Sequence, residues 1–313
     1  MQDISLKTLL EAGCHFGHKS DRWHPKATEF IYQEREGIHI IDLAKTRVGL
    51  LKAAEFISQI VQSGGTVLFV GTKRQAAAIV KEEAARVGAP YISKRWIGGF
   101  LTNWETVHKN LEKIRRLTEE EKNNAWKKYP KHERVKLSRY LKKLIEFYGG
   151  VYMLTEPPKA LMVVDIKREQ VAVREANKMY IPIVGVVDTN SDPTPIAYVV
   201  PANDDAVGSI QCLVHYLAEV YKEALEAWKK SEDEKKKMVN REQKTEVKKE
   251  KVEPQPVVAE VSTFPQIPAS KVIVAEKKAE VTKKEVRRTK KNKHEKKSSE
   301  KREAESAKKQ LNA

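Results

Sequence analysis

Three short apolar runs constrain the fold of this chain most strongly. They occupy residues 67–70, 160–164 and 181–187, and they stay largely apolar at successive positions, where a half-exposed strand would alternate with polar residues. Strands of this kind are buried on both faces, as in parallel sheets covered by helices. Stretches with apolar residues at three-to-four spacing lie between the runs. The sequence therefore predicts an α/β fold with a parallel sheet and helices on both faces.

The other elements follow from the same periodicities. Residues 5–12 have the pattern of a short helix, and residues 13–26 look like a long polar loop. Gly37 separates two apolar runs, which predicts a small hairpin. The expected hairpin strands are 30–32 and 38–41, the expected sheet strands are 66–70, 88–92, 160–164, 181–187 and 198–200, and the expected helices are 43–62, 74–86, 169–178 and 206 to about 228.

A pair of helices interrupts the sheet pattern. Two segments have apolar residues at helical spacing, with a polar turn at residues 123–130 between them. Each has a narrow apolar seam and otherwise charged faces, which is typical of an antiparallel coiled coil. We therefore expect residues 103–150 to form an inserted coiled-coil hairpin, with seams of Val107, Leu111, Ile114 and Leu117 and of Leu137, Leu141, Leu144 and Tyr148.

The composition changes near residue 230. Beyond it Lys and Glu dominate and aromatic residues are almost absent. Such a segment cannot bury enough apolar area to offset a backbone ordering entropy of roughly 1–2 kcal/mol per residue. The predicted organisation is a core domain of residues 1–102 and 151–230, the inserted hairpin of 103–150, and a disordered tail of 231–313.

The net charge of +16 is unevenly distributed. Residues 103–150 carry 13 Lys and Arg against 7 Asp and Glu, whereas residues 151–228 carry 6 against 11. The first half of the core and the tail are also basic. This division indicates that one face of the protein meets a polyanion while another is turned away from it.

Cysteine use and hydropathy narrow the class of protein. Cys14 and Cys212 are far apart and form no CxxC spacing, which argues against a disulfide framework or a structural zinc motif. No apolar run approaches the roughly 18 residues that span a membrane, and the start has no secretory pattern. We expect a soluble, reduced, intracellular protein.

Two turns combine cations with glycines at the predicted carboxyl ends of strands, where ligands bind in open α/β sheets. Lys73 and Arg74 follow the first strand, and this position suits either a phosphate contact or an ordinary solvated helix start. The spacing is not that of a nucleotide-hydrolysing loop. The second turn leads to Trp96 and Trp104, which are suited to stacking on unpaired bases or to anchoring the hairpin in the core. Thr102 or Asn103 can cap the helix that follows.

Metal-ligating residue types occur in two groups. Cys14, His15, His18 and His24 match no compact zinc spacing. The second group lies in loops at predicted strand ends, where Mg²⁺ could bind, and consists of Asp188, Asp192, Asp204 and Asp205. The alternative is that Asp188 caps a turn and that Asp204 or Asp205 caps the terminal helix.

No catalytic set emerges, since the sequence lacks the hydrolase, metalloprotease and dinucleotide motifs. The basic faces and the lack of a catalytic set favour a structural RNA-binding protein with no reaction of its own. Two alternatives stay open. One is a flavodoxin-like nucleotide-binding phosphotransferase that uses Lys73, Asp188 and Asp192. The other is a free RNA chaperone that acts through its basic tail.

Several motifs, in order over about residues 3–228, carry a resemblance to a known family. The sequence resembles the bacterial ribosomal small-subunit protein two family. Together the motifs are highly specific. They are AGCHFGH at 12–18, WHPK at 23–26, LFVGTKR at 68–74, RWIGGFLTNW at 95–104, IVGVVDTNSDP at 183–193 and PANDDA at 201–206.

The resemblance implies a flavodoxin-like domain with a protruding coiled-coil hairpin, docked on the small ribosomal subunit between head and body. It implies contacts to small-subunit ribosomal RNA and to other small-subunit proteins, and help in recruiting the large RNA-binding protein numbered one for translation initiation. The protein would then work in the cytoplasm on the ribosome, with no reaction, small-molecule substrate or membrane of its own. RNA shape and unpaired elements would guide recognition.

The family motifs and the basic hairpin together supply the expected site residues. The motifs leave open a divalent ion, Mg²⁺ or Zn²⁺, at His18, Asp188, Asp204 and Asp205, and no other cofactor is expected. The residues expected to contact RNA are Lys19, Arg22, Trp23, Lys26, Lys73, Arg74, Lys94, Arg95, Trp96, Asn103, Trp104, Lys109, Lys113, Arg115 and Arg116.

Overall fold

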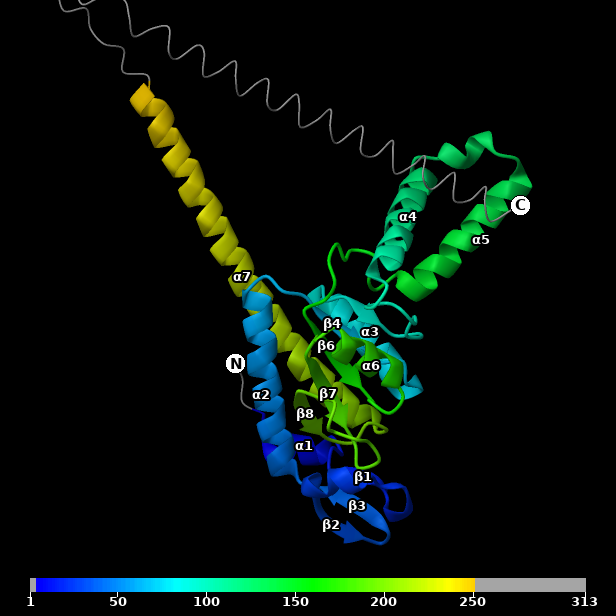
Figure 1. The fold of residues 1–313 in the computed structure, drawn as a ribbon, viewed down its shortest axis with the longest axis vertical. Coiled ribbons are helices and arrows are strands. Elements are labelled where there is room, and N and C mark those ends of the chain that lie inside the picture. Colours follow the sequence, from blue (N-terminus) through cyan, green and yellow to red (C-terminus); the bar gives the residue numbers. More distant parts are fainter. Residues whose placement is uncertain (1–3, 251–313) are drawn as a thin grey trace, which may run out of the picture. The chain divides into compact units, whose positions relative to one another are not determined.

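A computed structural model describes residues 4–250, with side chains as far as Glu234. Within this range, residues 4–249 form one compact unit. The predicted parallel sheet is present and has five strands in the order β5-β4-β6-β7-β8 (Figure 1). This is the order of doubly wound flavodoxin-like folds. The strands are β4 (Val67–Val70), β5 (Tyr91–Ile92), β6 (Ala160–Val164), β7 (Ile183–Val187) and β8 (Tyr198–Pro201).

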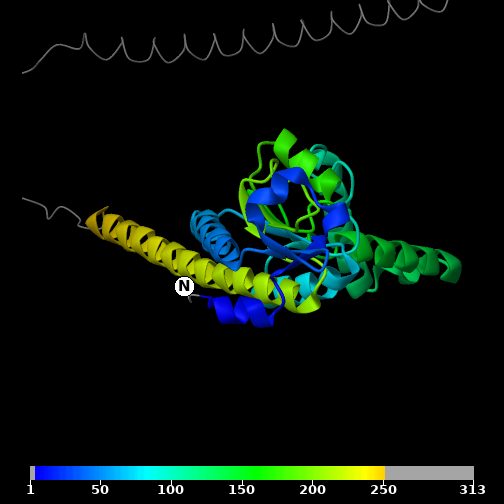
Figure 2. The same ribbon diagram turned by 90° about the horizontal axis from the view of Figure 1, so that it is seen from below.

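Both faces of the sheet are buried, as the continuous apolar runs predicted. In β4, Val67 and Phe69 belong to one apolar cluster, while Leu68 and Val70 belong to another on the opposite face. The first cluster packs against α1 (Leu6–Glu11), α2 (Leu43–Gln62), α3 (Arg74–Val87) and α7 (Val207–Glu250). The second packs against α6 (Gln170–Lys178) and the base of the hairpin. Helix α7 lies beside α2 in both views (Figures 1 and 2).

A second, three-stranded antiparallel sheet has the order β1-β3-β2. The predicted hairpin corresponds to β2 (Ile31–Arg35) and β3 (Ile38–Ile41). Residues 13–26, expected to be a loop, contain β1 (Phe16–Lys19) and the short 3-10 helix η1 (Ser20–Arg22), and a second one, η2 (Pro25–Phe30), begins there. That expectation was wrong because β1 has no alternating apolar pattern, and its backbone is held by pairing with β3 instead.

The helical pair predicted at 103–150 is also present. It consists of α4 (Trp104–Lys122), η3 (Ala125–Lys128) and α5 (Lys131–Tyr148), and it projects away from the sheet (Figure 2). Its own buried cluster contains Ile114, Leu117, Trp126 and Leu141. The coiled-coil character of this pair stays a prediction.

Helix α7 corrects the predicted carboxyl-terminal boundary. It extends over Val207–Glu250, so residues 231–250 are helical where disorder was expected. A helix already nucleated by its packed first turns adds residues at low cost. Lys and Glu, which are abundant beyond residue 230, are also good helix formers. The rest of the predicted tail, 251–313, lies outside the described residues. No helix within residues 4–250 is long and apolar enough to cross a membrane.

Candidate functional site

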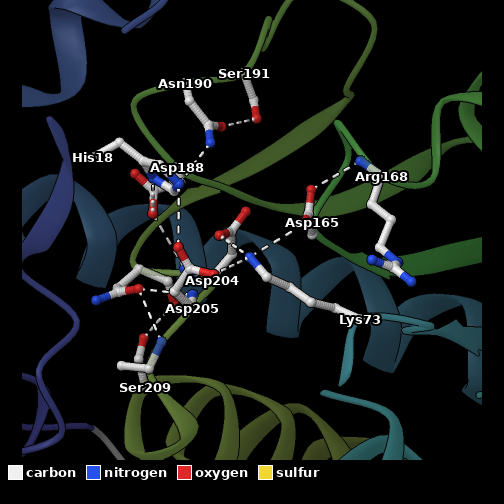
Figure 3. A network of polar contacts seen from close by, with 12 residues as sticks. His18, Lys73, Asp165, Arg168, Asp188, Asn190, Ser191, Asp204, Asp205 and Ser209 are labelled. Carbon is white, nitrogen blue, oxygen red and sulfur yellow. Dashed lines mark hydrogen bonds and ion pairs between the residues drawn. The ribbon is translucent and has the colours of Figure 1, made fainter. Parts of the chain in front are cut away.

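Charged side chains gather where four neighbouring strands end (Figure 3). Lys73 follows β4, Asp165 follows β6, Asp188 follows β7, and Asp204 and Asp205 follow β8. His18 reaches the same place from β1. We call these six residues the carboxyl-edge cluster: His18, Lys73, Asp165, Asp188, Asp204 and Asp205.

Lys73 is the internal cation of this cluster. Its Nζ lies 2.6 Å from Asp204 Oδ1, 2.7 Å from Asp205 Oδ1 and 3.2 Å from Asp165 Oδ2, and its side chain is only 12% exposed. Burial by itself would lower the pKa of Lys73, but its hydrogen bonds to Asp204 and Asp205 outweigh burial, so that pKa is raised. Lys73 is therefore a firmly protonated counter-charge for carboxylates.

Asp204 is the most enclosed acid of the cluster, with a side chain 1% exposed. Burial raises its pKa to about 7, the charges of Asp165 and Asp188 add to this rise, and Lys73 opposes it. Its Oδ1 is bonded to Lys73, but its Oδ2 has no hydrogen-bond partner among the described residues. A buried carboxylate oxygen without a partner is costly and calls for an explanation.

His18 connects the small sheet to the cluster. Its Nδ1 lies 3.1 Å from Asp188 Oδ2, and its Nε2 lies 3.2 Å from Asp205 Oδ2. The hydrogen bond with Asp188 raises the pKa of His18. The backbone passes very close here, because a Cβ on Gly17 would lie 2.8 Å from Thr189 Cγ2.

Three members of the cluster could hold a metal ion together. One ligand atom each from His18, Asp188 and Asp204 lies within 4.8 Å of the others. Asp205 contributes no atom to this set and instead pairs with Lys73 and His18. Neither Asp204 nor Asp205 caps α7, contrary to the alternative above. The amide oxygen of Asn203 accepts from the backbone N–H groups of Asp205 and Ala206.

Cys14 and His24, which belong to the first group of metal-ligating residue types, are not part of this possible metal site. Cys14 shares a hydrogen bond with Cys212, which raises its pKa. Both cysteines are free. His24 Nδ1 accepts from the backbone N–H of Lys26 at 3.3 Å.

The loop before α4 is organised by a carboxylate that sequence reasoning missed. Glu175, on α6, accepts from Trp96 Nε1 at 3.1 Å and from the backbone N–H groups of Gly99 at 2.7 Å and Leu101 at 3.0 Å. Burial works against its charged form, but the hydrogen bonds from Gly99 and Trp96 outweigh it, so the pKa of Glu175 is lowered. The sequence signal that could have revealed this role is that Glu175 is an acid on the otherwise apolar inner face of its helix.

The two tryptophans of this loop lie in the second apolar cluster. Trp96 is buried and Trp104 is partly buried, and their rings pack on Phe100 with centroids 5.2 and 5.8 Å away. Asn103 is the N-cap residue of α4, without a side-chain capping bond. This packing favours the interpretation that Trp96 and Trp104 anchor the hairpin.

A similar bond explains the turn at Thr72. Its backbone N–H and its hydroxyl both donate to the buried Glu169. Burial raises the pKa of Glu169. The first turn is thus closed by an internal acid, which leaves Arg74 as its exposed cation.

The remaining residues expected to contact RNA differ in whether their side chains are exposed and whether they form ion pairs within the protein. Lys26 pairs with Asp192 at 2.9 Å, and Lys94 pairs with Glu146 at 3.5 Å. Trp23 is 39% exposed. Among the described residues, no side-chain partner is found for Lys19, Arg22, Arg74, Arg95 and Lys109, all of which are exposed.

The cations of the two hairpin helices differ. On α4, Lys113 donates to the Tyr140 hydroxyl at 3.1 Å, Arg115 donates to the carbonyls of Tyr152 and Leu154 at 2.9 Å each, and Arg116 lies 3.7 Å from Glu120. On α5, six exposed cations have no partner in the described part of the chain. We call them the α5 basic face: Lys131, Arg134, Lys136, Arg139, Lys142 and Lys143.

Sequence comparison decides the family. The family model described as "Ribosomal protein S2" matches residues 9–224, which include both halves of the sheet domain and the hairpin. The chain belongs to the ribosomal protein S2 family. It is 46% identical over 233 residues to the small ribosomal subunit protein uS2 of Dictyoglomus thermophilum, covering 74% of this chain and 95% of that relative.

Membership of the S2 family confirms the resemblance drawn from the motifs. The chain is a structural component of the small ribosomal subunit, in the cytoplasm, and not an enzyme. The phosphotransferase alternative is therefore wrong. Its proposed Lys73 is enclosed by carboxylates at the switch point of the sheet, where such folds bind their ligands.

Proposed function

We propose that this chain binds small-subunit ribosomal RNA mainly through the α5 basic face. The observation that carries the proposal is that these six cations are exposed and lack described partners, while three of the four α4 cations expected to bind RNA are bonded within the protein. A cation that already has a partner must lose it before it can neutralise a phosphate. A cation without a partner has no such bond to break. Each contact that it makes with a phosphate releases counterions, which favours binding.

The spacing on α5 places three cations of the α5 basic face on one surface. Lys136, Arg139 and Lys143 are separated by three and four residues and so lie on one side of the helix. Leu137, Leu141 and Leu144 have helical spacing on another side and pack toward α4. The side of α5 that carries these three cations therefore faces away from the hairpin core. The exposed cations Lys19, Arg22, Arg74, Arg95 and Lys109 add further phosphate contacts from other parts of the molecule.

A salt-dependence measurement tests this proposal. The triple variant Lys136→Ala, Arg139→Ala, Lys143→Ala is compared with Lys52→Ala, Lys178→Ala, Lys222→Ala, which removes the same charge from exposed positions outside the hairpin. Binding to small-subunit ribosomal RNA is measured at several salt concentrations. Loss of three phosphate contacts should reduce the slope of log K against log salt by about 3 for the α5 variant. Equal slopes for both variants would contradict the assignment to α5.

The free RNA chaperone stays the rival. Deleting residues 251–313 separates the two, because a chaperone driven by its tail should lose nearly all RNA binding. A docked S2 protein should keep its place on the small subunit. Co-sedimentation with subunits on sucrose gradients measures this directly.

We further propose that the small sheet helps to recruit the large RNA-binding protein numbered one. Phe16 on β1 and Tyr32 on β2 are 48% and 71% exposed, although a folded chain would normally bury aromatic rings of this size. Exposed aromatic side chains are enriched at protein interfaces. Subunits with Tyr32→Asn should retain less of protein one than subunits with Tyr180→Asn, an exposed tyrosine at the end of α6. Asparagine is chosen because Tyr180 has φ 55°. Equal retention would argue against this surface.

The metal expectation also becomes a proposal. His18, Asp188 and Asp204 would hold a divalent ion such as Zn²⁺ or Mg²⁺, and the partnerless Asp204 Oδ2 is the observation that supports it. An ion bound only to the folded state at about 100 times its Kd should add about 2.7 kcal/mol of stability. Thermal unfolding with added Zn²⁺ or Mg²⁺ should show this gain for the unaltered chain and for His15→Ala. The gain should disappear in His18→Ala, and an undiminished gain there would exclude the site.

A further inference from the structure

A cavity of about 480 Å³ lies beside the carboxyl ends of β6 and β7. Three segments line it: residues 22–24, residues 166–177, which include most of α6, and the loop 190–195. None of the six residues of the carboxyl-edge cluster lines it. Its volume is within the range of small-ligand sites, roughly 300–1,000 Å³. We call it the α6 groove.

The groove carries an uncompensated positive charge. Arg22, Lys167 and Arg174 line it. In the described part of the chain Arg22 and Lys167 have no ion-pair partner, and Arg174 donates only to the carbonyl of Gln170, at 3.3 Å. Asp192 is the one acid in the lining, and it is already bonded to Lys26 Nζ at 2.9 Å. An anion entering the groove would meet three available cations.

Trp23 adds an aromatic surface to the same groove. Its ring lies 5.5 Å from the ring of His39, centroid to centroid, and 39% of the residue is still exposed. An indole supported from behind and open to solvent can stack on a nucleobase of any sequence. Cations beside an exposed aromatic ring form the usual combination at sites for unpaired nucleotides.

Hydrogen bonds between the three lining segments fix the groove in place. The backbone N–H of His24 donates to the carbonyl of Thr189 at 2.8 Å, which ties the Trp23 segment to the loop after β7. Asn177 Nδ2 donates to the carbonyl of Pro195 at 3.1 Å, which ties α6 to the same loop. A site that is already formed loses little entropy when it binds its ligand.

We infer that the α6 groove binds an unpaired nucleotide of a single-stranded RNA segment. The base stacks on Trp23, and the phosphate is held by Arg22, Lys167 and Arg174. This inference rests on the proposed RNA-binding function. The groove would be a second RNA site, separate from the α5 basic face. An acidic peptide would satisfy the cations equally well, but it would leave the indole without a stacking partner, so RNA is the better ligand.

A pair of matched variants tests the site in the full-length chain. Arg174→Ala and Lys178→Ala each remove one exposed cation from α6, but only Arg174 lines the groove. Fluorescence anisotropy with a labelled eight-nucleotide single-stranded RNA should show at least fivefold weaker binding for Arg174→Ala and less than twofold for Lys178→Ala. Trp23→Ala should weaken binding by about tenfold or more, and Trp23→Phe by less, because stacking is lost only in the first. Equal effects of the two α6 variants would overturn the inference.

Photo-crosslinking locates the bound strand independently. A 4-thiouridine in the oligonucleotide should crosslink within residues 22–24, 166–177 or 190–195, and crosslinks confined to other segments would refute the site. A short poly-glutamate peptide that displaces the RNA at lower concentration than an unlabelled oligonucleotide would show that the groove is for acidic protein, and so would also refute it. Arg174→Ala and Lys178→Ala could have equal effects on RNA affinity while the α5 triple variant still reduces the slope of log K against log salt. In that case the groove is rejected and the proposed function stands.

Discussion

Lys73 and the lysines of α5 are chemically identical, but they lie in opposite surroundings. Three carboxylates surround Lys73, whereas the α5 basic face is exposed and has no described partner. A charge enclosed by opposite charges is part of the folded structure, because its removal leaves buried carboxylates uncompensated. A solvated charge contributes little to folding. The same residue type therefore stabilises the domain in one region and remains available for a polyanion in the other.

The sharpest test of this comparison is Lys73→Met. The substitution keeps an apolar stem of similar length but leaves Asp165 and Asp204 without their cation. We expect a loss of about 3 kcal/mol in the free energy of unfolding, measured with urea. The neighbouring exposed Arg74→Met should change stability by less than about 0.5 kcal/mol. Partial rescue of Lys73→Met by Asp204→Asn would confirm that the unpaired carboxylate causes the loss, and a similar loss in both single variants would break the comparison.

Glu175→Gln should have the next largest effect. Replacing this charged acceptor weakens the bonds from Trp96, Gly99 and Leu101, at a cost of about 2 kcal/mol at pH 7. Because folding lowers the pKa of Glu175, its contribution is complete above the ordinary carboxyl pKa of about 4.3 and is lost as the pH falls through the lower, folded value. Urea unfolding at pH 7 and at pH 3 should therefore show a smaller difference between Glu175→Gln and the unaltered chain at the lower pH.

The exposed Glu82→Gln is the matched control for that experiment. It should show neither the loss at neutral pH nor the change with acid. A difference for Glu175→Gln that stays constant from pH 7 to pH 3 would mean that the charge of Glu175 is not what organises the loop.

Arg115→Ala should lower the free energy of unfolding by less, about 1 kcal/mol. The substitution removes two hydrogen bonds from the Arg115 side chain to backbone carbonyl groups near the base of the hairpin. Hydrogen exchange should report faster opening in the segment around Tyr152 and Leu154. Lys109→Ala, one to two turns earlier on α4 and without a described partner, should leave exchange there unchanged. Unchanged exchange in both variants would indicate that the Arg115 bonds do not hold this segment.

The smallest effects on stability are expected on the α5 basic face. Single substitutions of Lys136, Arg139 or Lys143 by alanine should each change the free energy of unfolding by less than about 0.5 kcal/mol. Their effect on RNA affinity should be much larger than their effect on stability. A variant of this face that unfolds the hairpin, seen as lost helical circular dichroism, would place these cations with Lys73 as structural charges.

Much of the fold could be predicted because it depends on local periodicity. The continuous apolar runs identified β4, β6 and β7, and the three-to-four spacing identified α2 with the same bounds, 43–62, that it has in the structure. Strand β1 was missed because Phe16–Lys19 has no apolar alternation and forms only by pairing with β3. The end of α7 was placed too early, because composition was interpreted as disorder where an established helix continues.

The sequence by itself determined the α/β class, the inserted helical pair, the basic hairpin and, through its motifs, the S2 family. It could not determine which charged residues are buried, because that depends on strands far apart in the chain ending at one edge of the sheet. Lys73 and Asp204 are 131 residues apart and meet only there. Likewise, Glu175 bonds the Trp96 loop, and Arg174 lines the same groove as Trp23, only because the tertiary structure brings α6 to both. Periodicity is a local property, whereas the partner of a charge is a property of the tertiary structure.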